Sequence, residues 1–138
     1  MTCPCGSTLG YDACCGRWHE GEPAPTAEAL MRARYAAFAL CKEPYLLATW
    51  HPSTRPPALA FEAGTKWLGL IILGASNVSE AATVEFIARF RIGGGSAARI
   101  HERSKFIREQ GLWFYVDDVQ PAQDRVPQPH HEPLAARK

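Results

Sequence analysis

The sequence predicts an α+β fold, in which a curved antiparallel sheet wraps around N-terminal helices and a small cysteine-rich segment precedes both. Apolar residues recur at helical spacing in the first third of the chain, and they alternate with polar residues along extended segments in the second half. Helices followed by a run of antiparallel strands pack as α+β, with the helices against one face of the sheet. The cysteines are concentrated at one end, with four of the five in the first 15 residues.

The helical part of the chain follows a stiff connector, Glu-Pro-Ala-Pro at residues 22–25. Thr26 is the expected N-cap, because its hydroxyl can accept a hydrogen bond from a free backbone N–H of the first turn. Apolar spacing from Leu30 to Cys41 predicts one helix. Pro44 is expected to begin a second, shorter helix that ends before the prolines of the next loop.

Four strands joined by glycine-containing turns are predicted to follow. The first spans residues 67–73, and residues 74–80 are interpreted as a turn because they contain Gly, Ser and Asn. Alternating patterns predict the other strands at residues 83–92, 98–107 and 112–116. Strands of about ten residues exceed the usual length of five or six. They suit a sheet that curves around a helix and leaves a cone-shaped cavity.

These elements divide the chain into three parts. Residues 1–21 form a small knuckle, residues 26–121 form the α+β domain, and residues 122–138 are expected to be a flexible tail with little to bury. The α+β part contains enough apolar surface to build its own core. The knuckle is therefore predicted to be a satellite of a domain that folds without it.

Composition excludes several classes of partner. The net charge is +1, which gives no electrostatic case for nucleic acid or an acidic membrane as the main partner. No apolar run approaches the roughly 20 residues of a membrane span. The chain opens directly on Met-Thr-Cys-Pro-Cys with no signal peptide, so the expected location is cytoplasmic. A basic sheet face is expected to be a solvated surface; it contains Arg89, Arg91, Arg99, Arg103 and Lys105.

Cysteine spacing is the strongest chemical signal. Cys3 and Cys5 are separated by one residue, and eight residues intervene before the adjacent pair Cys14 and Cys15. Thiols packed at one end of a chain point to a metal rather than to a disulfide framework, which would spread its cysteines to close longer loops. Four thiolates suit one Zn²⁺ in a tetrahedron, with no open position for water. We therefore expect one structural zinc.

Other interpretations of the cysteines remain open at this point. Two disulfides over so short a segment would add little, and a bond between the adjacent Cys14 and Cys15 would close a strained ring. An iron–sulfur cluster is less favoured, because these spacings differ from the usual ferredoxin pattern. His19 is a substitute ligand candidate, although a surface histidine is the simpler interpretation.

These residues also carry a family resemblance. Cys-Pro-Cys-Gly-Ser at 3–7 with Cys-Cys-Gly at 14–16 resembles the SEC-C zinc motif. The main domain resembles the YchJ family of uncharacterised bacterial proteins, and the similarity reaches to about Pro121. The matching segments are residues 30–38, 49–52 (Thr-Trp-His-Pro), 67–70, 102–106 and 113–117 (Trp-Phe-Tyr-Val-Asp). The resemblance implies a cystatin-like cone fold, similar to nuclear transport factor two, and no established reaction.

The resemblance is incomplete at the far end of the chain. Some relatives carry a second cysteine motif at the C-terminus. Here that region offers only His130 and His131. A role that depends on two zinc modules is therefore not expected for this chain.

Two charged residues interrupt apolar faces that should meet when helix packs on sheet. Arg34 shares a helical stripe with Leu30 and Phe38, and Glu102 lies between Ile100 and Phe106 on a strand. A buried charge is costly unless it is paired, so we expect Arg34 and Glu102 to pair directly or through one water. The candidate residues of a polar pocket are Arg34, Tyr35, Trp50, His51, Glu102, Ser104, Tyr115 and Asp117.

The sequence supports two functions of different classes. The first is a zinc-containing binding or adaptor module, in which the knuckle presents Tyr11, Arg17 and Trp18 to a protein partner. The second is an enzyme that binds a small molecule in the cone cavity and uses Glu102 or Asp117 as acid or base. The sequence contains no phosphate loop and no nucleophile–base signature, so it does not select a reaction.

Overall fold

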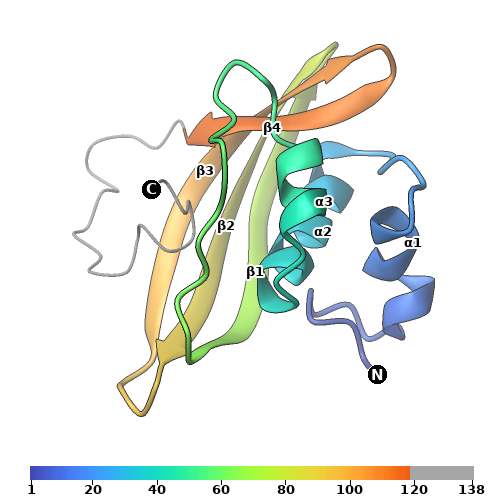
Figure 1. Ribbon diagram of the computed structural model, residues 1–138. Coiled ribbons are helices and arrows are strands. Elements are labelled where there is room, and N and C mark those ends of the chain that lie inside the picture. Colours follow the sequence, from blue (N-terminus) through green and yellow to red (C-terminus); the bar gives the residue numbers. More distant parts are fainter. Residues whose placement is uncertain (119–138) are drawn as a thin grey trace.

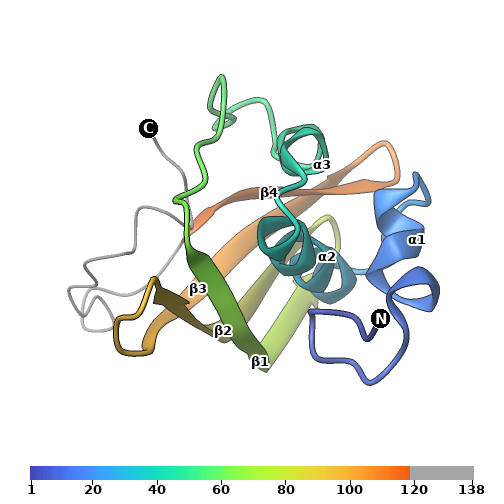
Figure 2. The ribbon, with the colours of Figure 1, turned by 60° about the horizontal axis from the view of Figure 1, so that its bottom comes forward.

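One four-stranded antiparallel sheet forms a curved wall, and two helices lie against its concave side (Figures 1 and 2). The computed structural model describes residues 1–118. The strands are β1 (Thr65–Val78), β2 (Ala81–Ile92), β3 (Ala98–Glu109) and β4 (Leu112–Asp118), in the spatial order β1-β2-β3-β4. The helices are α2 (Ala27–Ala39) and α3 (Glu43–Ala48), and the N-terminal segment adds η1 (Tyr11–Ala13) and α1 (Cys15–His19). The predicted fold class is confirmed.

Helix α2 begins where the sequence predicts and ends two residues earlier. The Thr26 hydroxyl accepts a hydrogen bond from the Ala29 N–H at 3.0 Å. At the other end Cys41 has a φ of 57°, and the Lys42 N–H donates to Ala37 O at 2.8 Å. This left-handed closing turn ends the helix at Ala39 and leaves Cys41 exposed, outside the apolar stripe that the spacing assigned to it.

Strand β1 is longer than predicted. Residues 74–78 continue the strand instead of forming a turn, and they pair with β2 as far as Val78 opposite Ala81. The register shifts twice, between Trp67 and Gly69 and between Ile72 and Gly74, so both glycines lie at bulges. The actual turn is at Ser79, whose φ is 59°. Polar residues occur in this part of β1 because it is an exposed edge strand.

The core fills the space between the helices and the sheet. The end of α3 is joined to β4 by two backbone hydrogen bonds, His51 N to Tyr115 O and Tyr115 N to Thr49 O, both 2.8 Å long. These bonds hold together two segments, the end of α3 and β4, that lie far apart in sequence. The largest fully buried core side chains of the cone are Tyr35, Phe86, Phe90, Phe106, Leu30, Leu46, Ile100 and Val84.

The N-terminal knuckle packs against α2. Cys3, Cys5 and Cys15 form a small buried cluster with Ala33 and Ala36, on the side of α2 that faces away from the sheet. That contact joins the knuckle to the domain, and whether residues 26–121 fold without it stays a prediction. Residues 119–121 and the expected tail lie outside the described residues. Among residues 1–118, no helix combines the length and apolar character that crossing a membrane requires.

Candidate metal centre

Backbone geometry brings the two cysteine pairs together. The Cys3 N–H donates to Leu9 O at 2.9 Å, and the Tyr11 N–H donates to Met1 O at 2.8 Å, which closes a tight loop. This loop contains Cys3 and Cys5. The chain then leads to the start of α1, where Cys14 is the N-cap and Cys15 the first residue. All four thiols are free. This geometry therefore does not support the disulfide interpretation.

The four sulfur atoms are spaced as metal ligands. All lie within 4.8 Å of one another. The Sγ atoms of Cys5 and Cys14 are 3.6 Å apart, and those of Cys14 and Cys15 are 4.0 Å apart. In a zinc tetrahedron with bonds of about 2.3 Å, the edges measure about 3.8 Å. The donor set and its spacing therefore fit one tetrahedral ion with four sulfur ligands.

Glycines permit this close packing. Gly6 follows the ligand Cys5 with a φ of 92°, in the left-handed region that side chains disfavour. Gly16 follows Cys15, and a Cβ there would lie 2.7 Å from Tyr11 O. The chain after each ligand pair thus depends on a residue without a side chain.

The thiols stabilise one charge among themselves. A hydrogen bond from Cys15 lowers the pKa of the Cys5 thiol to about 4. The same interaction raises the pKa of Cys15, and burial raises the pKa of Cys3. Four buried sulfurs can all ionise only when a cation balances them, so metal binding at this site would release protons.

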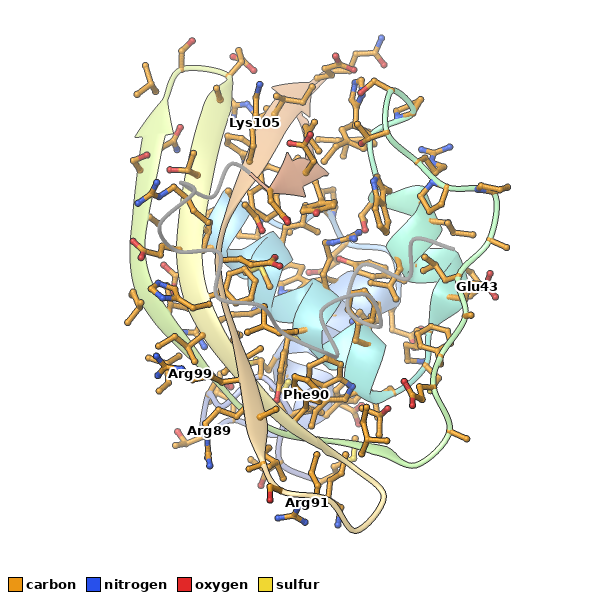
Figure 3. All side chains as sticks on the ribbon, turned by 90° about the vertical axis from the view of Figure 1, so that its left-hand side faces the viewer. Glu43, Arg89, Phe90, Arg91, Arg99 and Lys105 are labelled. Carbon is orange, nitrogen blue, oxygen red and sulfur yellow. The ribbon has the colours of Figure 1, made fainter. Side chains whose placement is uncertain are left out.

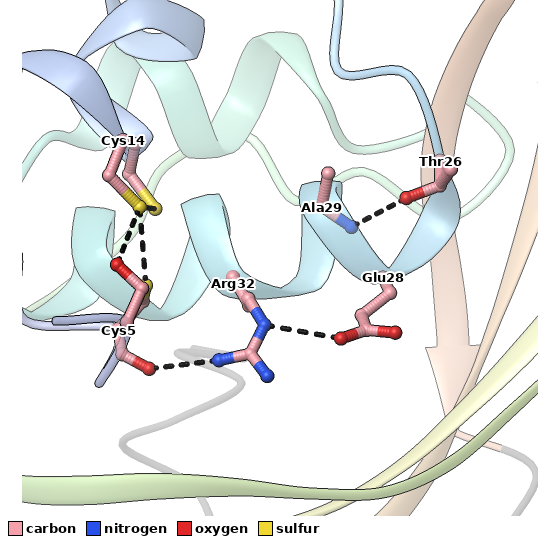
Figure 4. A network of polar contacts seen from close by, with 8 residues as sticks. Cys5, Cys14, Thr26, Glu28, Ala29 and Arg32 are labelled. Atoms are coloured by element: carbon pink, nitrogen blue, oxygen red, sulfur yellow. Dashed lines mark hydrogen bonds and ion pairs between the residues drawn. The ribbon is translucent and has the colours of Figure 1, made fainter. Parts of the chain in front are cut away.

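Groups around the cysteines hold the cluster in place (Figure 4). The Ser7 hydroxyl lies 3.0 Å from Cys14 Sγ. Arg32 of α2 donates to Cys5 O at 3.2 Å and pairs with Glu28 at 3.3 Å. Arg17 lies over the Trp18 ring, 4.4 Å from its centroid. Arg32 could not be singled out from the sequence because it is 27 residues from its carbonyl partner.

His19 is not a ligand in this arrangement. Its Nε2 donates to Ala33 O at 2.8 Å, so Nδ1 accepts from the Tyr11 hydroxyl. Burial lowers the pKa of His19 and keeps the ring neutral. The histidine therefore ties the knuckle to α2 as a hydrogen-bonding strut.

A second polar site lies inside the cone. Residues from α2, from the loop after α3 and from strands β2, β3 and β4 surround a cavity of about 30 Å³. That volume holds roughly two water molecules, whereas pockets for small ligands usually measure about 300–1,000 Å³. The lining residues are Met31, Arg34, Phe38, Trp50, Phe86, Glu102, Ser104, Tyr115 and Asp118.

Arg34 is the central group of this cavity. It is 3% exposed and donates from Nη1 to Leu46 O at 2.9 Å and to Thr49 Oγ1 at 2.8 Å. Its guanidinium lies over the rings of Trp50 and Tyr115, 4.9 and 4.5 Å from their centroids. Burial lowers its pKa to about 10, so the group is still a cation at neutral pH. Arg34 and Glu102 line one cavity, and their pairing, directly or through one water, stays a prediction.

Three pocket candidates lie elsewhere. Tyr35 packs against Trp67 with ring centroids 5.6 Å apart. His51 faces outward, where its Nε2 lies 3.1 Å from Glu109. Asp117 is exposed on the outer face of the sheet, opposite Lys105, and Asp118 takes the expected place in the cavity. The reason is a bulge in β4. Phe106 pairs with Tyr115 and Lys105 with Asp117, so Val116 is an extra residue and the two faces of β4 exchange beyond it.

Comparisons with known proteins agree with this architecture. Residues 26–118 match the family described as YchJ, middle NTF2-like domain. The chain belongs to the YchJ family. It is 54% identical over 118 residues to a UPF0225 protein of Xanthomonas campestris pv. campestris, which covers 83% of this chain and 92% of the relative. It is 52% identical over 120 residues to a UPF0225 protein of Bordetella pertussis, with 83% and 90% covered.

A solved YchJ-like structure extends the comparison to the knuckle. The solution structure of a SEC-C motif containing protein from Rhodopseudomonas palustris is 40% identical, with a TM-score of 0.79. The match covers 88% of this chain and 99% of that one. The resemblance of the sequence to the YchJ family and to a SEC-C motif protein is therefore confirmed, and the cysteine cluster is a possible metal site within it.

The first prediction concerns Gly16. Replacing Gly16→Ala forces Tyr11 O and the new Cβ apart and displaces the adjacent Cys15. We expect metal affinity to fall about 10- to 100-fold, as for other changes that disturb the support of a ligand. Gly10→Ala is the matched control, because its Cβ would meet Met1 O at an ordinary 3.7 Å. Competition with a chromogenic chelator measures both variants, and equal affinities would contradict the prediction.

The second prediction concerns Arg34 and Glu102. Arg34→Met or Glu102→Leu alone should cost roughly 3–5 kcal/mol of unfolding free energy, because the other charge stays buried without its partner. Arg34→Met with Glu102→Leu should cost much less than the sum of the two single changes. Denaturant titration of the four proteins measures the coupling. Simple addition of the two costs would show that the groups are independent.

Proposed function

We propose that this protein is a binding or adaptor module whose N-terminal knuckle is held by one structural zinc ion. The observation that carries the proposal is the set of four sulfurs, Cys3, Cys5, Cys14 and Cys15, all within 4.8 Å of one another. Zinc is favoured over other ions because it prefers thiolates in a tetrahedron without a further ligand. Four protein ligands leave no position for substrate or activated water, which makes the zinc structural.

The small size of the cavity favours a protein that binds its partner through its surface over an enzyme that binds a substrate inside. Its volume of about 30 Å³ leaves no room for an organic substrate. Its charged group, Arg34, already donates to a carbonyl and a hydroxyl within the fold. These contacts are those of a structural network that locks helix to sheet. The alternative, a small-molecule enzyme that uses Glu102, would require the cavity to open.

The knuckle offers a surface for a protein partner. Arg17 is exposed and stacks on the half-buried Trp18. Leu9 and Met1 are 52% and 78% exposed on the neighbouring loop. Arg, Trp and Met are residue types enriched in protein interfaces. The free thiols suit a reducing compartment, so we place this role in the cytoplasm.

The third prediction is one zinc ion per chain. Native mass spectrometry of protein purified from its own cell should show one zinc and no retained organic ligand. Cys14→Ser should lose the ion, whereas Cys41→Ser should keep it, because Cys41 is exposed and lies outside the cluster. A different metal, a ratio well below one, or a ligand that depends on Glu102 would overturn this function.

The fourth prediction tests the adaptor role. A photo-reactive amino acid placed at Arg17 should crosslink a discrete protein partner in the cell, because this position is exposed on the knuckle. The same group at Glu62, which is exposed in the loop before β1, is the control and should give no such product. Adding Cys14→Ser should abolish the Arg17 product. Equal products from both positions would show that the knuckle is not the binding surface.

A further inference from the structure

A cluster of cations occupies one end of the outer face of the sheet. It consists of Lys66, Arg89, Arg91 and Arg99, here called the basic cluster. Arg89 lies directly opposite Arg99 across β2 and β3, and Lys66 lies directly opposite Arg91 across β1 and β2. The three arginines each adjoin a buried core residue, so they point away from the helices (Figure 3). Lys66 lies on the same face, opposite Arg91.

The fold itself does not account for this cluster. Like charges directly opposite each other on a sheet are destabilising. Among residues 1–118, the ion pairs include none of the four side chains. Glu85, on the same face, pairs instead with His101 at 2.7 Å and with Arg103 at 3.6 Å. The nearest acidic side chain on the face thus neutralises other cations, and two like-charged pairs are left for an outside partner.

We propose that the basic cluster binds single-stranded nucleic acid through its phosphates. Three of the four residues are arginines, whose planar guanidinium matches two oxygens of a phosphate. Directly opposite side chains start about 5 Å apart, so Arg89 and Arg99 can reach the same phosphate. Arg91 is two residues along β2, about 7 Å from Arg89, and with Lys66 it can reach the next phosphate.

The shape of the face selects the kind of polyanion. The sheet is convex on this side (Figures 1 and 2). A duplex, with a persistence length of about 150 base pairs, or a flat bilayer would touch such a surface over a small area. A flexible single strand can follow the curvature. The sequence of residues 119–138 is not acidic overall, since it contains Asp124 and Glu132 against Arg125, Arg137 and Lys138.

Recognition on this face is independent of base sequence. The outward positions beside the cluster are Gly69, Ile87 and His101, and the ring of His101 is already paired with Glu85. Contacts to phosphates position a nucleic acid without reading it. The net charge of +1 describes the whole chain and not this face, because most of the acidic residues lie elsewhere in the sequence.

The fifth prediction is a salt-dependent affinity for a single strand. The metal-loaded full chain is titrated against a fluorescent oligothymidylate of about 15 nucleotides. With two phosphates neutralised, affinity should fall about sevenfold between about 50 and about 200 mM salt. Removing the contacts to one of them with Arg89→Gln and Arg99→Gln should weaken binding and reduce the salt effect to about 2.6-fold.

The control variant removes two charges away from the cluster. Lys42→Gln with Lys105→Gln should leave binding and its salt dependence as they are, since Lys105 lies opposite Asp117 at the other end of the face. Thermal unfolding should show the arginine variant to be at least as stable as the parent chain, which separates lost binding from lost folding. The proposal is overturned if the oligonucleotide does not bind at about 50 mM salt, or if the two double variants lose affinity equally. It is also overturned if polyglutamate or vesicles with phosphatidylglycerol compete more strongly at equal charge concentration.

Discussion

Helix α2 is buried on nearly every side, and the rest of the molecule is arranged to cover it. Leu30 and Phe38 face the sheet, and Ala33 and Ala36 face the cysteine cluster. Arg34 is turned toward α3 and β4. A helix that is apolar all round must be enclosed, because no single layer can remove all of its surface from water. The sheet covers one side of α2, and the knuckle supplies cover for the other.

Small residues on α2 fix how closely the knuckle can approach. Ala33 and Ala36 have no exposed surface and lie against Cys5 and Cys15, which are themselves buried. Larger side chains at these two positions would push the sulfurs away from the helix. The polar contacts at the border, from Arg32 to Cys5 O and from His19 to Ala33 O, set the rotation of the knuckle on this surface.

Much of the architecture could be predicted because it is encoded locally. Thr26 marks a helix start by its own hydroxyl, and the four cysteines mark a ligand set by their spacing. Errors arose where a bulge reverses which residues of a strand face the core. The bulge where β4 pairs with residues 105 and 106 puts Asp118 in the cavity instead of Asp117, and the β4 sequence does not indicate it. Residues 74–78 were likewise expected to form a turn. They form part of β1 because β2 supplies pairing partners beyond the bulge at Gly74.

Partners that are distant in sequence could not be predicted either. A charged residue on an apolar helical stripe indicated that Arg34 would be buried, and it is. It did not indicate that a main-chain carbonyl and two rings would surround the guanidinium, because those groups come from α3 and β4. The space around Arg34 is thus filled by contacts between elements, and the cavity that Arg34 lines measures about 30 Å³.

The zinc that we propose for the knuckle would supply order that this segment lacks by itself. A segment of about 20 residues cannot bury enough apolar surface to order itself. Its own buried residues are mainly cysteines, and thiols kept close together without a cation favour only one ionised group, as the low pKa of Cys5 shows. An ion that accepts four thiolates converts this crowding into folding free energy. Since Ala33 and Ala36 share one buried cluster with three of the cysteines, the proposed zinc would order the surface that covers this side of α2.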